Sequence, residues 1–193
     1  PKDRYIAYHL ERAKGGIAMT MTAGSAVVSK DSPPSFDNIH VYKDEVVPWI
    51  KKLTEAIHDQ DCKIMIQLTH LGRRTSWSKG DWLPSVSSGK HREPAHKAFP
   101  KIVESWDIER IIKEYGDAAE RMKEAGMDGV ELEAQGHLIG QCMSPVTNEL
   151  ESEYGGNFEN RLRFTIDVLS EIRKKVGKKF IVGIRCVFDE VEE

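Results

Sequence analysis

The sequence predicts an α/β protein of the (β/α)8 TIM-barrel type, with about half of the barrel in these 193 residues. Helical segments alternate with short apolar runs, which indicates right-handed crossovers and a parallel sheet. Polar residues gather where the apolar runs end, as at the carboxyl ends of barrel strands. No Gly-x-Gly-x-x-Gly loop follows a run, which disfavours a dinucleotide-binding sheet. A complete barrel needs about 250 residues, so a partial barrel is expected.

The spacing of apolar residues predicts each element in turn. Helices are expected over residues 4–14, 44–57, 107–125 and 157–176, and strands over 17–22, 63–68, 130–134 and 180–187. Asp44 and Asp107 are predicted to cap the second and third helices, and the fourth is expected to run from Asn157. Residues 71–104 keep no period and are rich in Pro and Gly, which predicts an excursion on the rim of a single domain spanning residues 1–193.

Composition limits the class of function. The net charge is −3, from 28 basic and 31 acidic residues that are mixed throughout, so nucleic acid is not an expected partner. The three cysteines form no CxxC pair, and His91 and His96 lie in the irregular excursion, so no metal site is predicted. No apolar run is long enough to cross a membrane, and a reducing cytoplasm is the expected location.

One stretch resembles a site more than a scaffold. The predicted strand over residues 130–134 carries Glu131 and Glu133 and is followed by a polar turn with Gln135 and His137. Gln67 lies inside another predicted strand and Arg185 inside the last one. Buried amides and charges need partners, and a ligand can supply them as well as the protein can.

Several motifs in this order resemble the Old Yellow Enzyme family of flavin-dependent oxidoreductases, in its N-demethylase-like branch. They are Thr22-Ala23-Gly24-Ser25-Ala26-Val27, Gln67-Leu68-Thr69-His70-Leu71-Gly72-Arg73, Gly129-Val130-Glu131-Leu132, Ser144-Pro145 with Asn148, Glu153-Tyr154-Gly155-Gly156, Glu159-Asn160-Arg161 and Val182-Gly183-Ile184-Arg185. The resemblance implies a barrel that holds FMN at its strand ends, with strands two to five in this chain.

By this resemblance three residues are expected to contact the cofactor. Gly24 would approach the flavin, Gln67 would hydrogen-bond the pyrimidine side of the ring, and Arg185 would lie near the ring edge that becomes negative on reduction. A fixed guanidinium suits that position because it stabilises developing negative charge. The alternatives are an ion pair between Arg185 and a neighbouring carboxylate, and a core amide for Gln67.

The chain departs from the family pattern after the strand that contains Glu133. Where much of the family has His-x-x-His or His-x-x-Asn, this sequence has Glu133-Ala134-Gln135-Gly136-His137, one residue shorter. Glu133, Gln135 and His137 are therefore the candidate catalytic residues. An ionised carboxylate only accepts hydrogen bonds, so Glu133 would attract a cationic N-methylated amine rather than polarise an enone.

Under this hypothesis Glu133 orients or deprotonates the ammonium, and His137 carries protons with an unperturbed pKa. Trp77 or Trp82 would offer an aromatic face to the cation. A structural salt bridge from Glu133 to Arg73 or Arg74, and a packing role for His137, are the alternatives.

Three functions stay open at this point. The first is FMN-dependent oxidation or demethylation of an N-methylated amine, and the second is NAD(P)H-dependent reduction of an enone or dienoyl-CoA. The third is a fragment without flavin or activity. Half a barrel leaves sheet edges unpaired, so such a fragment should bind FMN weakly and associate with copies of itself as a homo-oligomer. In several relatives a 4Fe-4S cluster follows the barrel, bound by residues outside a segment like this one.

Overall fold

The computed structural model describes residues 3–32, 38–74, 85–93 and 99–190, with the side chains of residues 24 and 25 excepted. Its main feature is a five-stranded parallel sheet in the order β2-β1-β3-β6-β7. The strands are β1 (Met19–Val27), β2 (Ile39–His40), β3 (Lys63–Thr69), β6 (Gly129–Ala134) and β7 (Ile181–Cys186). The four predicted strands are thus present and adjacent, and the two-residue β2 adds an edge that periodicity could not predict.

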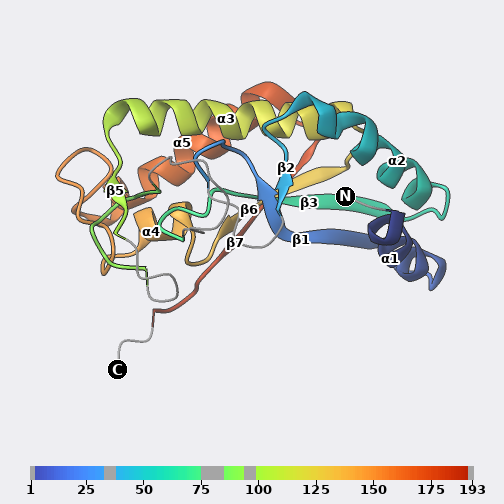
Figure 1. Ribbon diagram of the computed structural model, residues 1–193, viewed down its shortest axis with the longest axis horizontal. Helices are drawn as coiled ribbons and strands as arrows, with labels where there is room; N and C mark the ends of the chain where they lie inside the picture. Colours follow the sequence, from blue (N-terminus) through green and yellow to red (C-terminus); the bar gives the residue numbers. More distant parts are fainter. Residues whose placement is uncertain (1–2, 33–37, 75–84, 94–98, 191–193) are drawn as a thin grey trace.

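The helices are α1 (Asp3–Lys14), η1 (Asp44–Val46), α2 (Val47–His58), α3 (Ser105–Glu124), α4 (Leu138–Met143) and α5 (Phe158–Val176). Helices α2, α3 and α5 lie together over one face of the sheet (Figure 1). They are amphipathic, and their apolar stripes meet the apolar residues of β3 and β6 in one buried cluster. None of the described helices is long and apolar enough to span a bilayer.

Both predicted helix caps are corrected. Asp44 begins the 3-10 turn η1 rather than capping α2. Helix α3 begins after Glu104, and Asp107 is its third residue, whose carboxylate accepts the backbone N–H of Glu104 at 3.0 Å. Asn157, where the last helix was expected to start, is the N-cap of α5, and its side chain accepts the backbone N–H of Asn160 at 2.9 Å.

The excursion contains two short strands, β4 (Val86–Ser87) and β5 (Lys101–Ile102), which pair in parallel. Together with α4 they lie at the end of the sheet where the long strands finish (Figure 1). The sequence prediction missed α4, which is only six residues long and contains Gly140. A Cβ at Gly140 would lie 2.5 Å from the carbonyl oxygen of Ala134, so glycine is needed for α4 to pack against β6.

The face of the sheet opposite α2, α3 and α5, here called the inner face, carries the candidate site. Residues alternate between the two faces of a strand, and register partners in neighbouring parallel strands share a face. Gln67 pairs with Glu131 across β3 and β6, and Glu133 pairs with Arg185 across β6 and β7. Since Glu131 and Glu133 are two residues apart, all four side chains belong to the inner face.

Candidate active site

The inner face brings the predicted residues Gln67, Glu133 and Arg185 onto one surface, as the hypothesis requires. Gln67 and Glu133 are buried, with 3% and 6% of their surfaces exposed, whereas the Arg185 side chain is 58% exposed. These positions lie towards the carboxyl ends of adjacent strands, where barrel enzymes place their chemistry. The arrangement is therefore a candidate site formed by strands, held by the backbone register of the sheet.

Gln67 is not the backbone-bonded core amide of the alternative interpretation. Its Nε2 donates a short hydrogen bond to Oε1 of Glu131 on the neighbouring strand. The carboxylate fixes the orientation of the amide, because only the NH2 group of glutamine can donate. Glu131 is thus a member of the site that the sequence analysis noted only as a strand charge.

Glu133 accepts the backbone N–H of Gln135 through Oε1 at 2.9 Å, and its Oε2 lies 3.9 Å from Nη1 of Arg185. Burial raises the pKa of the Glu133 carboxyl, the Gln135 N–H and the Arg185 charge oppose that rise, and the nearby Glu131 adds to it. An ion pair of this length with an exposed guanidinium contributes less than about 1 kcal/mol to stability. The salt bridge predicted with Arg73 or Arg74 is absent from the contacts of Glu133 in the described residues, and Arg185 takes its place.

His137 lies just before α4 and is bonded to the end of β3. Its Nδ1 is 2.7 Å from Oγ1 of the buried Thr69. Burial, together with the neighbouring Arg74 and His70, lowers the pKa of His137 to about 4. The expected unperturbed pKa is therefore wrong, and the ring is neutral near pH 7.

The structure describes Gln135 fully, position 24 in part, and the predicted tryptophans not at all. Gln135 is exposed, and its backbone rather than its side chain contacts Glu133. The β1–β3 pairing shifts between Thr22 and Ala26, which brackets Gly24, and such irregularities occur beside active sites. The side-chain surroundings of position 24, and Trp77 and Trp82 entirely, lie outside the described residues.

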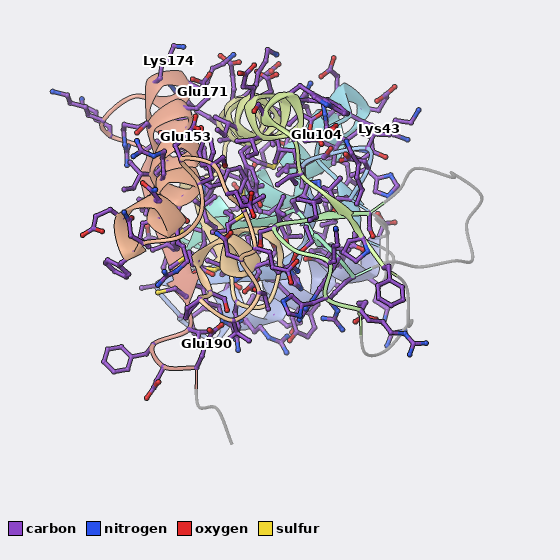
Figure 2. The ribbon with its side chains drawn as sticks, turned by 90° about the vertical axis from the view of Figure 1, so that its left-hand side faces the viewer. Lys43, Glu104, Glu153, Glu171, Lys174 and Glu190 are labelled. Atoms are coloured by element: carbon purple, nitrogen blue, oxygen red, sulfur yellow. The ribbon has the colours of Figure 1, made fainter. Side chains whose placement is uncertain are left out.

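A second feature of this end of the molecule is a cavity of about 380 Å³, lined mainly by α4, the loop after it, the start of α5 and the tail that follows β7. Its wall includes Arg73, Ala134, Gly136, Ser144, Phe158 and Glu190. Figure 2 looks onto this end of the sheet and shows Glu190 at its lower edge, on the tail that follows β7. The Ser144 hydroxyl donates to Oε2 of Glu190 at 2.7 Å and joins this tail to the end of α4.

A network around Gln141 supports the cavity wall. Its Oε1 accepts the backbone N–H of Arg73 at 3.2 Å and the Ser87 hydroxyl at 2.9 Å, while its Nε2 donates to the Gly136 carbonyl at 3.0 Å. One buried amide therefore connects the ends of β3, β4 and β6. The sequence prediction missed Gln141 because it missed α4, although Leu138, Ile139, Cys142 and Met143 carry a short helical spacing.

The comparison with protein families identifies the chain. Residues 1–193 match the model of the NADH:flavin oxidoreductase / NADH oxidase family over their whole length. The chain belongs to this family. It is 65% identical over 190 residues to a probable N-methylproline demethylase of Rhizobium meliloti, covering 98% of this chain and 28% of the relative. It is 44% identical over 196 residues to a multifunctional alkene reductase/demethylase of Caballeronia cordobensis, covering 98% and 29% respectively.

Solved structures confirm the fold prediction. Morphinone reductase in complex with tetrahydroNAD superimposes with a TM-score of 0.86 at 25% identity, over 94% of this chain and 53% of that one. The sheet is accordingly part of a TIM barrel, and the family uses a flavin. This chain spans less than a third of the length of the two curated relatives named above.

The inner face fits a flat cofactor of this kind. Gly183 lies in register with Glu131, and of the described residues a Cβ placed there would touch only the Glu131 side chain, at 3.8 Å. The inner face is therefore open at Gly183, with the polar amide of Gln67 on β3 and the cation of Arg185 on β7.

Proposed function

We propose that the protein carrying this chain is an FMN-dependent oxidoreductase that oxidises or demethylates an N-methylated amine. The observation that carries the proposal is a buried carboxylate, Glu133, at the strand end where much of the family has histidine. A buried negative charge attracts a cation more strongly than an exposed one. The names of the two curated relatives above, both of which include demethylase, support the same chemistry.

Each residue of the inner face then has a defined task. Glu133 binds the substrate ammonium and removes its proton, and the raised pKa of this carboxyl makes it the stronger base. Gln67, oriented by Glu131, and the exposed Arg185 would hold the flavin by its polar edges. Bound FMN would supply the acceptor for the hydride that leaves the carbon next to nitrogen.

The neutral ring of His137 favours a second candidate function. A neutral imidazole has one N–H, and with Nδ1 near Thr69 its Nε2 could donate to a substrate carbonyl. That arrangement suits NAD(P)H-dependent reduction of an enone or dienoyl-CoA. The name of the Caballeronia relative includes both activities.

The two functions are separated in the full-length protein by two assays. Anaerobic bleaching of the flavin by N-methylated amines measures the first, and NADH-driven reduction of cyclohexenone measures the second. For Glu133→Gln we expect kcat/KM with amines to fall about 30-fold or more, because a buried charge partner is lost. Glu153→Gln removes an exposed carboxylate from the loop before α5 and is the matched control. Unchanged amine turnover in Glu133→Gln would refute the proposal.

A further inference from the structure

The amide of Gln67 is buried but only partly paired within the described residues. The side chain is 3% exposed on the inner face, and its Nε2 donates to Oε1 of Glu131 on the neighbouring strand. Its carbonyl oxygen accepts no hydrogen bond from the part of the chain that the structure describes. Buried oxygens are normally paired, because leaving one without a donor is costly. The free oxygen of Gln67 therefore points to a ligand that brings an N–H or O–H group.

Glu131 decides which end of the Gln67 amide is left free. Glutamine carries a donor NH2 group and an acceptor oxygen on one planar group, so a half-turn of the amide exchanges them. Here a half-turn would place the oxygen of Gln67 against the carboxylate of Glu131, and two acceptors repel each other. The two residues are also direct partners across β3 and β6. Strand register and the carboxylate together leave the oxygen, and not the NH2 group, without a protein partner.

The pair of Gln67 and Glu131 lies beside an opening in the inner face. Gly183 on β7 is in register with Glu131, and of the described residues a Cβ there would touch only the Glu131 side chain, at 3.8 Å. Arg185, two residues further along β7, is a cation on the same face. The pyrimidine ring of FMN carries one N–H between two carbonyl groups, and this donor matches the free oxygen of Gln67.

We propose that Glu131 is a positioning residue for FMN, which holds Gln67 so that the carbonyl oxygen of its amide accepts the N–H of the pyrimidine ring. This inference rests on the proposed function, since it concerns bound FMN, and it adds how the cofactor is held and tuned. An acceptor backed by a carboxylate disfavours negative charge on the ring, whereas the guanidinium of Arg185 favours it. Glu131 therefore lowers the reduction potential of FMN, and Arg185 raises it.

The test measures the affinity and the reduction potential of FMN in the full-length protein. For Glu131→Gln we expect the Kd of oxidised FMN, from fluorescence quenching on binding to the apoprotein, to rise about 10-fold, because a buried hydrogen bond is no longer fixed. Binding of reduced FMN should change little, since removal of a negative charge offsets the loss. A tenfold change in the ratio of the two affinities raises the potential by about 30 mV. Glu153→Gln, in the exposed loop before α5, should change neither quantity.

A double variant shows whether Glu131 acts through Gln67. Gln67→Ala should weaken the binding of oxidised FMN by a similar factor, and Glu131→Gln added to it should shift the potential clearly less than it does alone. The potential also separates positioning from damage to the fold, because misfolding weakens the binding of both oxidation states alike. An unchanged potential in Glu131→Gln, or an equal shift with and without Gln67, would overturn the positioning role.

The outcomes separate this inference from the proposed function. If FMN binds and N-methylated amines do not bleach it, the amine-oxidising function fails, and the potentials still decide the role of Glu131. If amines bleach the flavin and the potential does not respond to Glu131→Gln, the function stands and the positioning role fails. If the full-length protein binds no FMN, both fail.

Discussion

Gly72→Ala should destabilise the protein far more than alanine at another glycine of similar backbone conformation. Gly16 has a φ of +87°, and no atom of the described residues lies within 4 Å of the position that an added methyl group would take. Gly16→Ala therefore costs only the left-handed backbone, about 1 kcal/mol. At Gly72 the same backbone cost applies, and the new methyl group would also lie 2.3–2.8 Å from the Gln141 carboxamide.

The extra cost at Gly72 follows from the contacts of Gln141. A flexible amide can rotate away from a methyl group, so the steric contact itself is relieved. Rotation of the Gln141 amide breaks the buried hydrogen bonds that its oxygen accepts from the Arg73 N–H and the Ser87 hydroxyl. Each buried polar group left without a partner costs about 1–3 kcal/mol. Together with the backbone cost, Gly72→Ala should lower the free energy of unfolding by about 3–7 kcal/mol.

Urea unfolding followed by far-UV circular dichroism measures both variants against the wild type. The double variant Gly72→Ala/Gln141→Ala decides the mechanism, because it removes the amide that the methyl group would displace. The double variant should lose less unfolding free energy than the sum of the losses of the two single variants. Equal losses for Gly72→Ala and Gly16→Ala would refute the role assigned to Gln141.

Three further outcomes are expected. Burial raises the pKa of Asp31, but hydrogen bonds from His70, Ser29 and Arg110, with the charge of His70, hold it below its ordinary value. The stability that Asp31 contributes is therefore present above about pH 4 and is lost as the pH falls below that value. Asp31→Asn should flatten that acid dependence in pH-dependent unfolding, and an unchanged slope would contradict it. The His137 ring should titrate near pH 4 by NMR, and stability should fall between about pH 6.5 and that value, because the unfolded ring binds the proton first; titration near pH 6.5 would contradict the burial. Asn157→Ala should cost about 1 kcal/mol through loss of the cap, measured by thermal unfolding, and no loss would remove that role.

The long elements could be predicted from sequence because each is encoded by its own spacing. Helix α3 repeats apolar residues over 20 positions, and β3 is a continuous apolar run broken only by Gln67. Short elements could not be predicted in this way. β2 has two residues and α4 has six, and both depend on neighbours distant in sequence rather than on local propensity.

Residue type alone was enough to mark some residues of the candidate site, whereas those that depend on the pairing register of the sheet were missed. Glu133 and Arg185 are charged residues inside apolar strands, so the sequence alone identified them as candidate site residues. Glu131 and Gln141 act through partners 64 and 68–70 residues away, which spacing within one segment does not reveal. The pKa of His137 was predicted wrongly for the same reason, since burial against Thr69 is a tertiary effect.

The charge balance of the inner face gives a physical reason to prefer a cationic substrate. Glu131 is bonded to the neutral amide of Gln67, which satisfies its hydrogen bonding without cancelling its charge. In the described part of the chain, the cation that faces Glu133 is the exposed Arg185, at 3.9 Å. Two carboxylates and one solvated guanidinium leave this surface negative, and a negative flavin on reduction would make it more so. A substrate that brings a positive charge relieves this repulsion, whereas a neutral enone does not.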